Sequence, residues 1–241
     1  MFLRNHYIRK EWLFEFSKFL FIQQPNKLFK RSLESMKIIN PSVILEDKID
    51  GKELLKKIER IGRVCYKSEG NIKEESAEKF IANILHRHHE SVIEHESISV
   101  RVICDRGVTH EIVRHRIASY SQESTRYCNY SNDKFGNELT FIKPCFWNED
   151  DEAYKTWENM MKNIEETYMK MIASGVTPQE SRSILPNSIK TEIVITMNLR
   201  EWRHFFKLRI APSAHPQMIE VAKMILDLFK KNVPLIFDDI E

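Results

Sequence analysis

The run Arg114-His115-Arg116 is the part of this chain whose side chains most plainly require a partner. Neighbouring positive charges repel one another, so a fold tolerates such a run where an anion or open solvent compensates for it. Arginine can grip a phosphate with two parallel hydrogen bonds. Hydroxyl residues, which suit phosphate oxygens, follow the run: Ser119, Ser121, Ser124, Thr125 and Tyr127. The segment predicts a site for a phosphate-bearing ligand, and the alternative is a solvated basic turn.

The composition limits what this ligand can be. The 241 residues carry a formal net charge of only +2, so we expect no general attraction to nucleic acid. A phosphate site must therefore come from a local concentration of positive charge. A hydrophobic content of 42% and a charged content of 30% are typical of a folded globular chain. No apolar run approaches the ~20 residues of a membrane-spanning helix, so no membrane partner is predicted.

Further arginines stand beside predicted turns, caps or helix ends. Together with the first run they are Arg114, Arg116, Arg126, Arg182, Arg200 and Arg209. In a nearly neutral chain such a set can hold about two phosphate-bearing ligands. In a helix, Arg114 and Arg116 would point about 200° apart, which suits two ligands or two subunits meeting over one site. For each arginine alone, the alternative is an exposed ion pair.

A second cluster, rich in histidine, suggests a metal at first sight. It contains His86, His88, His89 and His95 with Glu90, Glu94 and Glu96. The helical zinc motif H-E-x-x-H is absent, and no second group of ligands elsewhere completes a shell. We therefore predict no metal site, and interpret the run as the exposed end of a helix or the wall of an organic-ligand site.

The four cysteines lie far apart, which indicates reduced thiols in a cytoplasmic protein and disfavours a zinc ribbon. Pro144-Cys145 is similar to the nucleophile region of the cysteine-dependent thymidylate synthases, but Phe146-Trp147 follows where those enzymes have histidine. No base adjoins Cys145 in the sequence, so a structural role is favoured. Ser124 likewise has no evident histidine–carboxylate pair to activate it as a nucleophile. It is interpreted as a residue that binds the phosphate or a ring of the ligand.

The elements that must position these residues follow from the apolar periodicity. Alternation predicts strands at residues 97–104 and 189–197, and a short strand at 36–45 interrupted by Pro41. Three-four spacing predicts helices at residues 53–66, 73–88, 150–173 and from 216 onward, with a short helix leading to Arg114 and a loop at 129–138. The pattern predicts a single α+β domain over residues 36–241, with a central, mostly antiparallel sheet flanked by helices.

Two capping boxes mark helix starts near the arginines. Thr177 pairs with Glu180, with proline at the first helical position, and Asn198 pairs with Glu201. The second of these helices should run to Arg209. Residues 1–35 are aromatic and basic and stand apart as an N-terminal extension, either an accessory helix or a weak surface or targeting segment.

These landmarks together resemble one enzyme family. Arg114-His115-Arg116, followed after seven residues by Ser124, is the signature of the flavin-dependent thymidylate synthases. Other family landmarks appear in family order across about residues 36 to 230: His89-Glu90-Ser91 to Glu94-His95, Arg182 before Leu185-Pro186, Asn198-Leu199-Arg200, and Arg209 before His215. The N-terminal 35 residues fall outside the resemblance.

The resemblance implies a reaction and an assembly. Members of this family methylate dUMP to dTMP, take the carbon from methylenetetrahydrofolate, use FAD reduced by NADPH as hydride source, and release tetrahydrofolate. They are homotetramers with active sites at subunit interfaces. We therefore expect dUMP and folate as small-molecule partners and FAD as cofactor.

The resemblance also assigns site residues by position. It implies FAD contacts from His89, Ser91, Arg114, His115, Arg116, Gln122, Asn198, Leu199, Arg200 and His204. It implies dUMP contacts from Glu111, Ile112, Val113, Arg114, Gln122, Glu123, Ser124, Thr125, Arg126, Arg182 and Arg209. Arg209 is the expected catalytic residue, because a fixed guanidinium would stabilise the ionised uracil ring at N3.

This chain departs from the family pattern at the proposed dUMP site. Ser121-Gln122 stands where the family commonly has Asn-Glu, with the acid displaced to Glu123, and Glu111 stands where Gln is common. These changes affect the detailed dUMP contacts that the resemblance implies.

Overall fold

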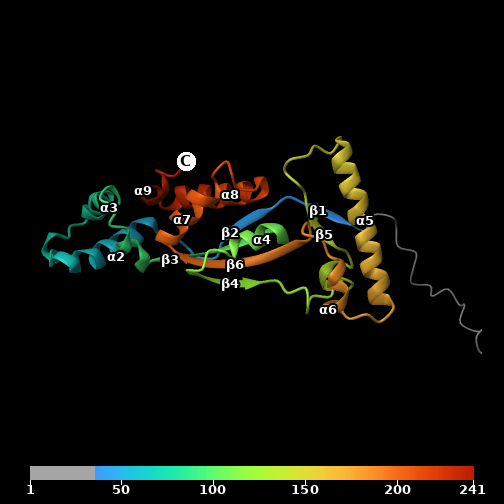
Figure 1. Cartoon of the computed structure of the whole chain (residues 1–241). Helices are drawn as coiled ribbons and strands as arrows, with labels where there is room; N and C mark the ends of the chain where they lie inside the picture. Colours follow the sequence, from blue (N-terminus) through green and yellow to red (C-terminus); the bar gives the residue numbers. More distant parts are fainter. Residues whose placement is uncertain (1–35) are drawn as a thin grey trace, which may run out of the picture. The chain divides into compact units, whose positions relative to one another are not determined.

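A four-stranded sheet with the strand order β2-β3-β6-β4 forms the centre of the computed structural model, which describes residues 36–241 (Figure 1). Its strands are β2 (Ser42–Leu45), β3 (Ser97–Asp105), β6 (Lys190–Asn198) and β4 (Ala118–Gln122). All neighbouring pairs are antiparallel. Residues 36–241 form one compact unit. The α+β fold with an antiparallel sheet is confirmed, and the interpretations offered for residues 1–35 lie outside the described part of the chain.

Pro41 divides the strand predicted at residues 36–45 into two strands of different sheets. β1 (Lys37–Ile39) pairs in parallel with β5 (Thr140–Ile142), whereas β2 joins the central sheet. Proline has no backbone N–H to give to a ladder, so a continuous strand through this position is disfavoured. β5 and β4 were not expected from the sequence, because both are short and neither shows a clean apolar alternation.

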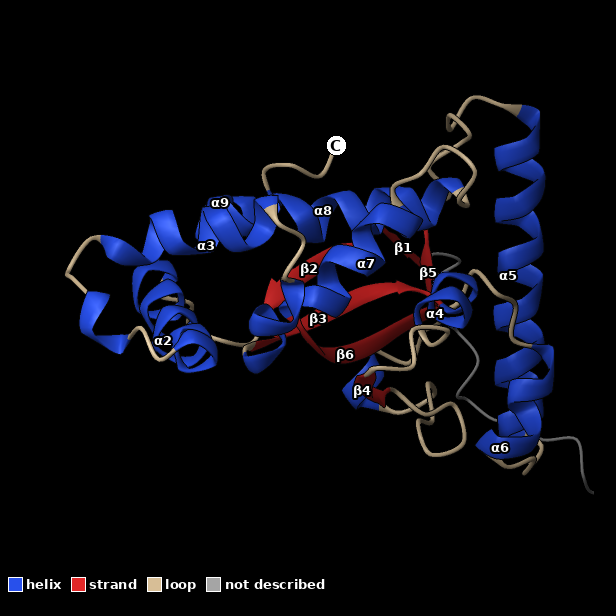
Figure 2. Cartoon of the chain, turned by 60° about the vertical axis from the view of Figure 1, so that its left-hand side comes forward, coloured by secondary structure: helices blue, strands red, loops and turns tan. Residues whose placement is uncertain are grey.

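One face of the central sheet carries the core. Its alternating residues are buried as predicted: Ile98, Val100, Val102 and Cys104 on β3, and Thr191, Ile193, Ile195 and Met197 on β6. Three helices cover this face (Figure 2): α4 (Arg106–Ile112), α7 (Leu199–Arg209) and α8 (Pro216–Asn232). The other face bears half-exposed polar residues such as Ser99 and Thr196, as is common for antiparallel sheets.

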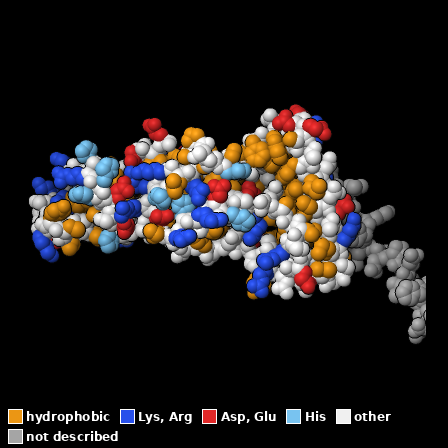
Figure 3. Space-filling model, in the orientation of Figure 1, with side chains coloured by type: hydrophobic (Ala, Val, Ile, Leu, Met, Phe, Trp, Pro, Cys, Tyr) orange, Lys and Arg blue, Asp and Glu red, His pale blue; other side chains and the backbone are white. Residues whose placement is uncertain are grey.

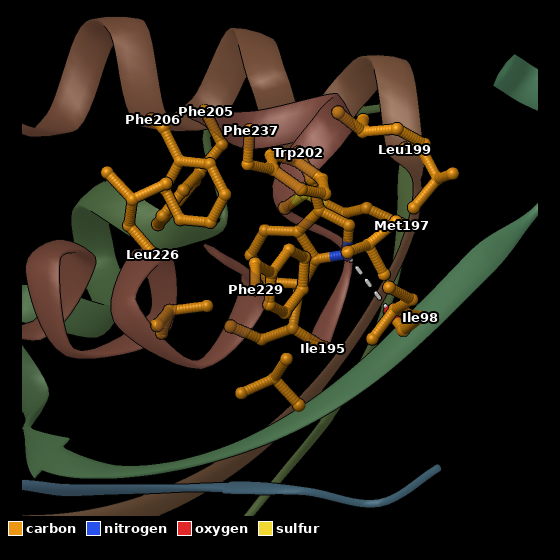
Figure 4. Close-up of a cluster of buried hydrophobic side chains, with 14 of the residues drawn as sticks. Ile98, Ile195, Met197, Leu199, Trp202, Phe205, Phe206, Leu226, Phe229 and Phe237 are labelled. Carbon is orange, nitrogen blue, oxygen red and sulfur yellow. Dashed lines mark hydrogen bonds between the residues drawn. The ribbon is translucent and has the colours of Figure 1, made fainter. Parts of the chain in front are cut away.

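Trp202 lies at the centre of the contact between sheet and helices (Figure 4). Its ring stacks on Phe206 and meets Phe205 and Phe229 edge to face. Because a buried indole N–H needs a partner, Nε1 donates to the Ile98 carbonyl oxygen at 3.0 Å. This aromatic cluster fixes α7, and α7 in turn carries Asn198, Glu201 and Arg209 at its two ends.

The remaining helices lie around this core. They are α2 (Gly51–Arg63), α3 (Ser76–His86), α5 (Glu152–Ala173), α6 (Pro178–Ser181) and α9 (Pro234–Phe237), with 3-10 turns η1 (Val64–Tyr66), η2 (Glu69–Asn71), η3 (Glu90–His95), η4 (Asp133–Phe135) and η5 (Arg182–Ile184). α2 begins earlier than predicted because the Asp50 side chain accepts hydrogen bonds from the first backbone amides. α5 packs on a second apolar cluster around Phe141 and Tyr168. None of the helices in residues 36–241 is long and apolar enough to cross a membrane.

The two predicted capping boxes differ in outcome. Thr177 and Glu180 exchange both reciprocal hydrogen bonds, so the box at α6 is confirmed. At α7 only half forms: the Asn198 side chain accepts from the Glu201 backbone N–H at 2.8 Å. The Glu201 carboxylate turns instead toward His115. The Glu201 side chain, which the sequence predicted to cap α7, therefore interacts with the buried His115 instead.

Candidate active site

Arg114-His115-Arg116 occupies the turn between α4 and β4. α4 ends at Ile112, so the expectation that the two arginines diverge along a helix is wrong in its geometry. In the turn, His115 is only 4% exposed, whereas Arg114 and Arg116 face solvent. The hydroxyl of Tyr120 lies 2.9 Å from the Ile112 carbonyl oxygen and 2.6 Å from that of His115, which fastens the turn to β4.

The inward side chain of His115 links both ends of α7. The Arg209 Nε–H donates to His115 Nε2 at 3.0 Å, and His115 Nδ1 lies 3.3 Å from Glu201 Oε1. A guanidinium can only donate, so His115 Nε2 must be the unprotonated nitrogen. The ring proton is then on Nδ1, where it donates to Glu201.

The surroundings keep His115 neutral. Burial, and after it the positive charge of Arg209 and the neighbouring His204, lower its pKa from 6.5 to about 4. Burial also raises the pKa of Glu201 above its ordinary value. Near neutral pH the imidazole is thus an uncharged bridge, and the fixed positive charge in this group is the Arg209 guanidinium.

Arg209 is the last residue of α7, and Glu111 on α4 holds it. Its Nη1 donates to Glu111 Oε2 at 2.8 Å, and its Nη2 donates to the Glu111 backbone oxygen at 2.9 Å. With the bond to His115, three guanidinium nitrogens are used, which fixes the plane of the group. The Glu111 carboxylate that departs from the family pattern is therefore the direct partner of the expected catalytic residue.

A cavity of about 390 Å³ lies along one side of α7. Its lining residues are Glu90, Glu94, Ile117, Asn198, Arg200, Glu201, His204 and Lys207. Asn198, Arg200 and His204 from the expected flavin set thus meet at one place. Arg200 Nη1 donates to Glu94 Oε1 at 2.5 Å. Figure 3 shows basic, acidic and histidine side chains interspersed over the face that carries α7.

A second opening, which we call the α6 cleft, has a volume of about 720 Å³. Its lining residues are Arg106, Thr125, Gln179, Glu180, Arg182, Ser183 and Leu185. It brings together Thr125 and Arg182, which the resemblance assigned to dUMP. Within residues 36–241, neither Arg182 nor Arg106 has a carboxylate partner. Glu180 lies in the same lining but forms no ion pair with either arginine, unlike the carboxylate partners of Arg200 and Arg209.

Several other residues of the expected dUMP set adjoin Thr125 in the sequence. The Glu123 carboxylate accepts from the Tyr130 hydroxyl at 2.8 Å and from Lys190 Nζ at 2.7 Å. Ser124 Oγ accepts from the Arg126 backbone N–H at 3.3 Å. The Arg126 guanidinium lies 5.4 Å from the centre of the exposed Tyr127 ring.

Some expected ligands lie away from the two openings or are buried. Gln122 donates to the Thr109 and Thr191 hydroxyls at 3.0 and 3.3 Å, so its side-chain amide is bound to α4 and β6. Leu199 and Ile112 are buried in the core, while Val113 is exposed on the turn. His89 and Ser91 are exposed at the start of η3 and do not line the cavity, although Glu90 and Glu94 of the same turn do.

Comparison with known proteins decides the family. A family model described as "Thymidylate synthase complementing protein" matches residues 48–235. The "Flavin-dependent thymidylate synthase" of Pyrococcus furiosus is 40% identical over 163 residues, which cover 67% of this chain and 66% of that protein. The chain belongs to the flavin-dependent thymidylate synthase family. The protein of the same name from Geobacter sulfurreducens is 33% identical over 184 residues, 73% of this chain and 78% of that one.

The fold agrees with a solved structure. The UMP/dUMP methylase PolB of Streptomyces cacaoi, crystallised with 5-Br dUMP, superposes with a TM-score of 0.67 at 22% identity. The superposition covers 84% of this chain and 95% of that one. The predictions of family and fold class are confirmed. The match to the Pyrococcus protein spans about two thirds of its length, 66%.

The structure also brings together three potential metal ligands that the sequence separates. One ligand atom each from His115, Glu201 and His204 lies within 4.8 Å of the others. Both His115 nitrogens are already used, by Arg209 and Glu201, and a guanidinium beside the ring disfavours a cation. Among the described residues, the histidine run 86–95 forms no such group.

Three residues near the two openings were missed by sequence reasoning. Tyr120 lies within the hydroxyl-rich segment but holds the turn rather than a ligand. Lys207 lines the cavity. It lies three residues after His204 on α7, and residues at this spacing share one face of a helix, so the sequence could have indicated it. Arg106 carries no sequence signal, because the cleft it lines is built from α4, α6 and the loop after β4.

Proposed function

We propose that this thymidylate synthase methylates dUMP to dTMP, with methylenetetrahydrofolate as carbon donor and NADPH as reductant of its FAD, and releases tetrahydrofolate. The observation that carries the proposal is the geometry of Arg209, which Glu111 and neutral His115 fix with three donated hydrogen bonds. An oriented guanidinium of this kind stabilises negative charge that develops on a substrate ring without having to reorganise during the reaction.

The residues that line the cavity along α7 fit a flavin. Asn198, Arg200, His204 and Lys207 line one cavity and supply amide, imidazole and cationic donors for a pyrophosphate and a ring. Bound FAD would accept hydride from NADPH and supply the reducing equivalents. Arg200 would exchange its exposed Glu94 partner for a phosphate oxygen, a change that costs little because exposed ion pairs are weak.

The dUMP site has two ends in this proposal. Arg182 and Thr125 in the α6 cleft, with Ser124 and Arg126 on the adjoining loop, take the phosphate. Arg209 lies at N3 of the uracil ring and stabilises the ionised ring, whose C5 then attacks the carbon donor. His115 holds Arg209 in place and, being neutral, leaves the positive charge of the guanidinium directed at the ring.

The assembly and location are part of the proposal. We expect a homotetramer with active sites at subunit interfaces, in the cytoplasm, with residues 36–241 as the catalytic domain. Apolar side chains exposed beside the arginine turn support an interface there: Ile117 is 67% exposed and Tyr127 is 77% exposed. Arg114 and Arg116, which point to solvent in one subunit, would then reach a ligand shared with a neighbour.

The test is direct assay of the purified full-length protein. With FAD, NADPH, methylenetetrahydrofolate and dUMP, we expect a yellow protein, dTMP by chromatography, and tetrahydrofolate as the folate product. Colourless protein that binds no flavin and forms no dTMP would contradict the proposal. In cells, the gene should rescue a thymidine auxotroph. Arg209→Ala should not, while Arg87→Ala, an exposed arginine away from both openings, should.

A further inference from the structure

Arg106 is a half-buried cation without an assigned task. It is the first residue of α4 and lines the α6 cleft beside Thr125 and Arg182. Its Nη1 is buried, and within residues 36–241 it has no hydrogen-bond partner. A charged donor removed from water without an acceptor is costly, so such a group points to an acceptor that a ligand brings.

The neighbours of Arg106 do not supply that acceptor. Glu180 is the carboxylate in the cleft lining, and its Oε2 already accepts from the Thr177 backbone N–H at 3.0 Å and from the Thr177 hydroxyl at 2.5 Å. These hydrogen bonds lower the pKa of Glu180, which confirms that they favour its charged form. Asp105, next in sequence, does not line the cleft, and its carboxylate accepts from the Val108 N–H and the Gln217 amide.

The cleft therefore presents two guanidinium groups, from Arg106 and Arg182, together with the hydroxyl of the buried Thr125. Two arginines and a hydroxyl suit a compact oxyanion that carries two charges, which a phosphate monoester does. A single carboxylate offers only two oxygens and one charge, so it would leave part of this donor set unused.

The position of Arg106 along α4 relates the cleft to Arg209. Glu111, which holds Arg209, lies five residues further along the same helix, a rise of about 7.5 Å. The phosphate and base of a nucleotide are separated by its sugar, so one short rigid element would set the distance between the two groups that receive them.

We propose that Arg106 is a phosphate-binding residue of this enzyme, which with Arg182 and Thr125 makes the site select a nucleoside monophosphate over the nucleoside. The inference rests on the proposed function, since it assigns the phosphate end of the dUMP site. It adds to the site a residue that lies outside the arginine-rich segment. The Nη1 donor of this residue has no partner among the described residues.

The experiment compares Arg106→Met with the wild type as FAD-loaded enzyme, by calorimetric titration with dUMP and with deoxyuridine. Loss of charged hydrogen bonds should weaken dUMP binding by about 10- to 100-fold, while deoxyuridine affinity stays unchanged. Arg106→Lys should recover part of the dUMP affinity, because the charge returns without the planar pair of donors. Arg87→Met is the matched control and should bind both ligands as the wild type does.

Unchanged dUMP affinity in Arg106→Met, or an equal loss for deoxyuridine, would overturn the inference. A selective loss of affinity for methylenetetrahydrofolate would also overturn it, since the cleft would then serve the folate carboxylates. If the wild type binds no dUMP, the proposed function fails, and inorganic phosphate decides the inference alone. Phosphate should raise the melting temperature of the wild type and of Arg106→Lys but not of Arg106→Met; no rise in the wild type would refute the phosphate site.

Discussion

The arginines near α7 and those in the α6 cleft differ in whether a carboxylate pairs with them. Around α7, Arg200 pairs with Glu94, Arg209 with Glu111, and each guanidinium has a carboxylate within hydrogen-bond distance. In the α6 cleft, Arg182 has no such partner among the described residues. The difference indicates that position and charge are separate requirements: a carboxylate partner fixes where a guanidinium points, but it also cancels the charge that would attract an anion.

The same distinction holds between Arg203, which is buried, and Arg106, which is half-buried. Arg203 makes two hydrogen bonds of 2.6 Å to Asp239, donates from Nε to Glu90 and contacts the Ile236 carbonyl oxygen, so each of its three guanidinium nitrogens has a partner within the fold. Arg106 keeps a buried donor unfilled. We infer that a carboxylate partner orients arginines such as Arg209, whereas the arginines of the α6 cleft keep their donors open for a ligand.

Arg209→Ala tests the orienting side of this comparison and should have the largest effect. Loss of a preorganised donor at the reacting ring should lower kcat by about 10²- to 10³-fold. Release of the C5 proton of dUMP, measured with C5-tritiated substrate, reports the step directly. Arg209→Lys should remain severely impaired, because lysine cannot reach Glu111 and His115 together. If Arg209→Ala retains most of the wild-type proton release, the guanidinium is not the activating group.

Glu201→Ala tests whether the Glu201 carboxylate, which contacts His115 instead of completing the capping box, holds His115 in place. Without it, the His115 Nδ1–H is buried with no acceptor, which costs about 1–3 kcal/mol in the free energy of unfolding. Urea denaturation measures this loss. In the double variant with His115→Phe, the two losses should not add, because each removes the same hydrogen bond. Full additivity would show that the two side chains act independently.

The pH dependence of stability tests the neutral state of His115. Its pKa is about 4 in the folded protein and 6.5 when unperturbed, so between these values the unfolded state binds more protons. The contribution of His115 to the free energy of unfolding is therefore complete above pH 6.5 and is lost as the pH falls toward 4. Glu201, with its raised pKa, has the opposite slope.

The difference between the wild type and His115→Gln, measured by denaturation at several pH values, isolates the His115 contribution. We expect this difference to shrink as the pH falls from 6.5 to 4. A constant difference would mean that the imidazole does not change its protonation between the folded and unfolded states in this range.

The sequence was sufficient for the elements whose signals are local. The alternation in β3 and β6, the long helix α5 and the capping box at Thr177 are set by residues close in sequence, and the structure has them where predicted. β4 was missed because its polar residues resemble a loop, and it becomes a strand through pairing with β6 from a distant part of the chain.

The sequence named candidate residues for the site but not their arrangement. The family signature pointed to Arg209 and His115 as candidates, yet it did not pair His115 with Glu201 or Arg209 with Glu111. The turn that buries His115 depends on Tyr120, and Arg106 acquires its neighbours only when α4 meets α6. Contacts between segments far apart in sequence decide which donors are used and which remain open.

Glu111→Gln removes the carboxylate partner of Arg209, so that this arginine, like those of the α6 cleft, has no ion pair. Its effect on activity should be smaller than that of Arg209→Ala. The glutamine oxygen can still accept from Arg209 Nη1, so orientation persists, while the negative charge that offsets the guanidinium is removed. We expect the KM for dUMP to fall by less than about tenfold, with kcat nearly unchanged, because a half-exposed charge is screened. Steady-state kinetics separates the two constants. A collapse of kcat would show that the carboxylate charge, not its hydrogen bond, is what the reaction requires.

The pair Arg200 and Glu94 should show the smallest effect on stability. Its side chains are 52% and 42% exposed, and exposed ion pairs contribute about 0.2–1 kcal/mol even at the 2.5 Å separation found here. A double-mutant cycle with Arg200→Met and Glu94→Gln, measured by urea denaturation, should give a coupling energy in that range. Flavin affinity should respond differently: Arg200→Met weakens it, whereas Glu94→Gln preserves or improves it, since the arginine is released. If Glu94→Gln weakens flavin binding as much as Arg200→Met does, the carboxylate holds Arg200 in a binding geometry, and orientation and charge are not separable at this end of α7.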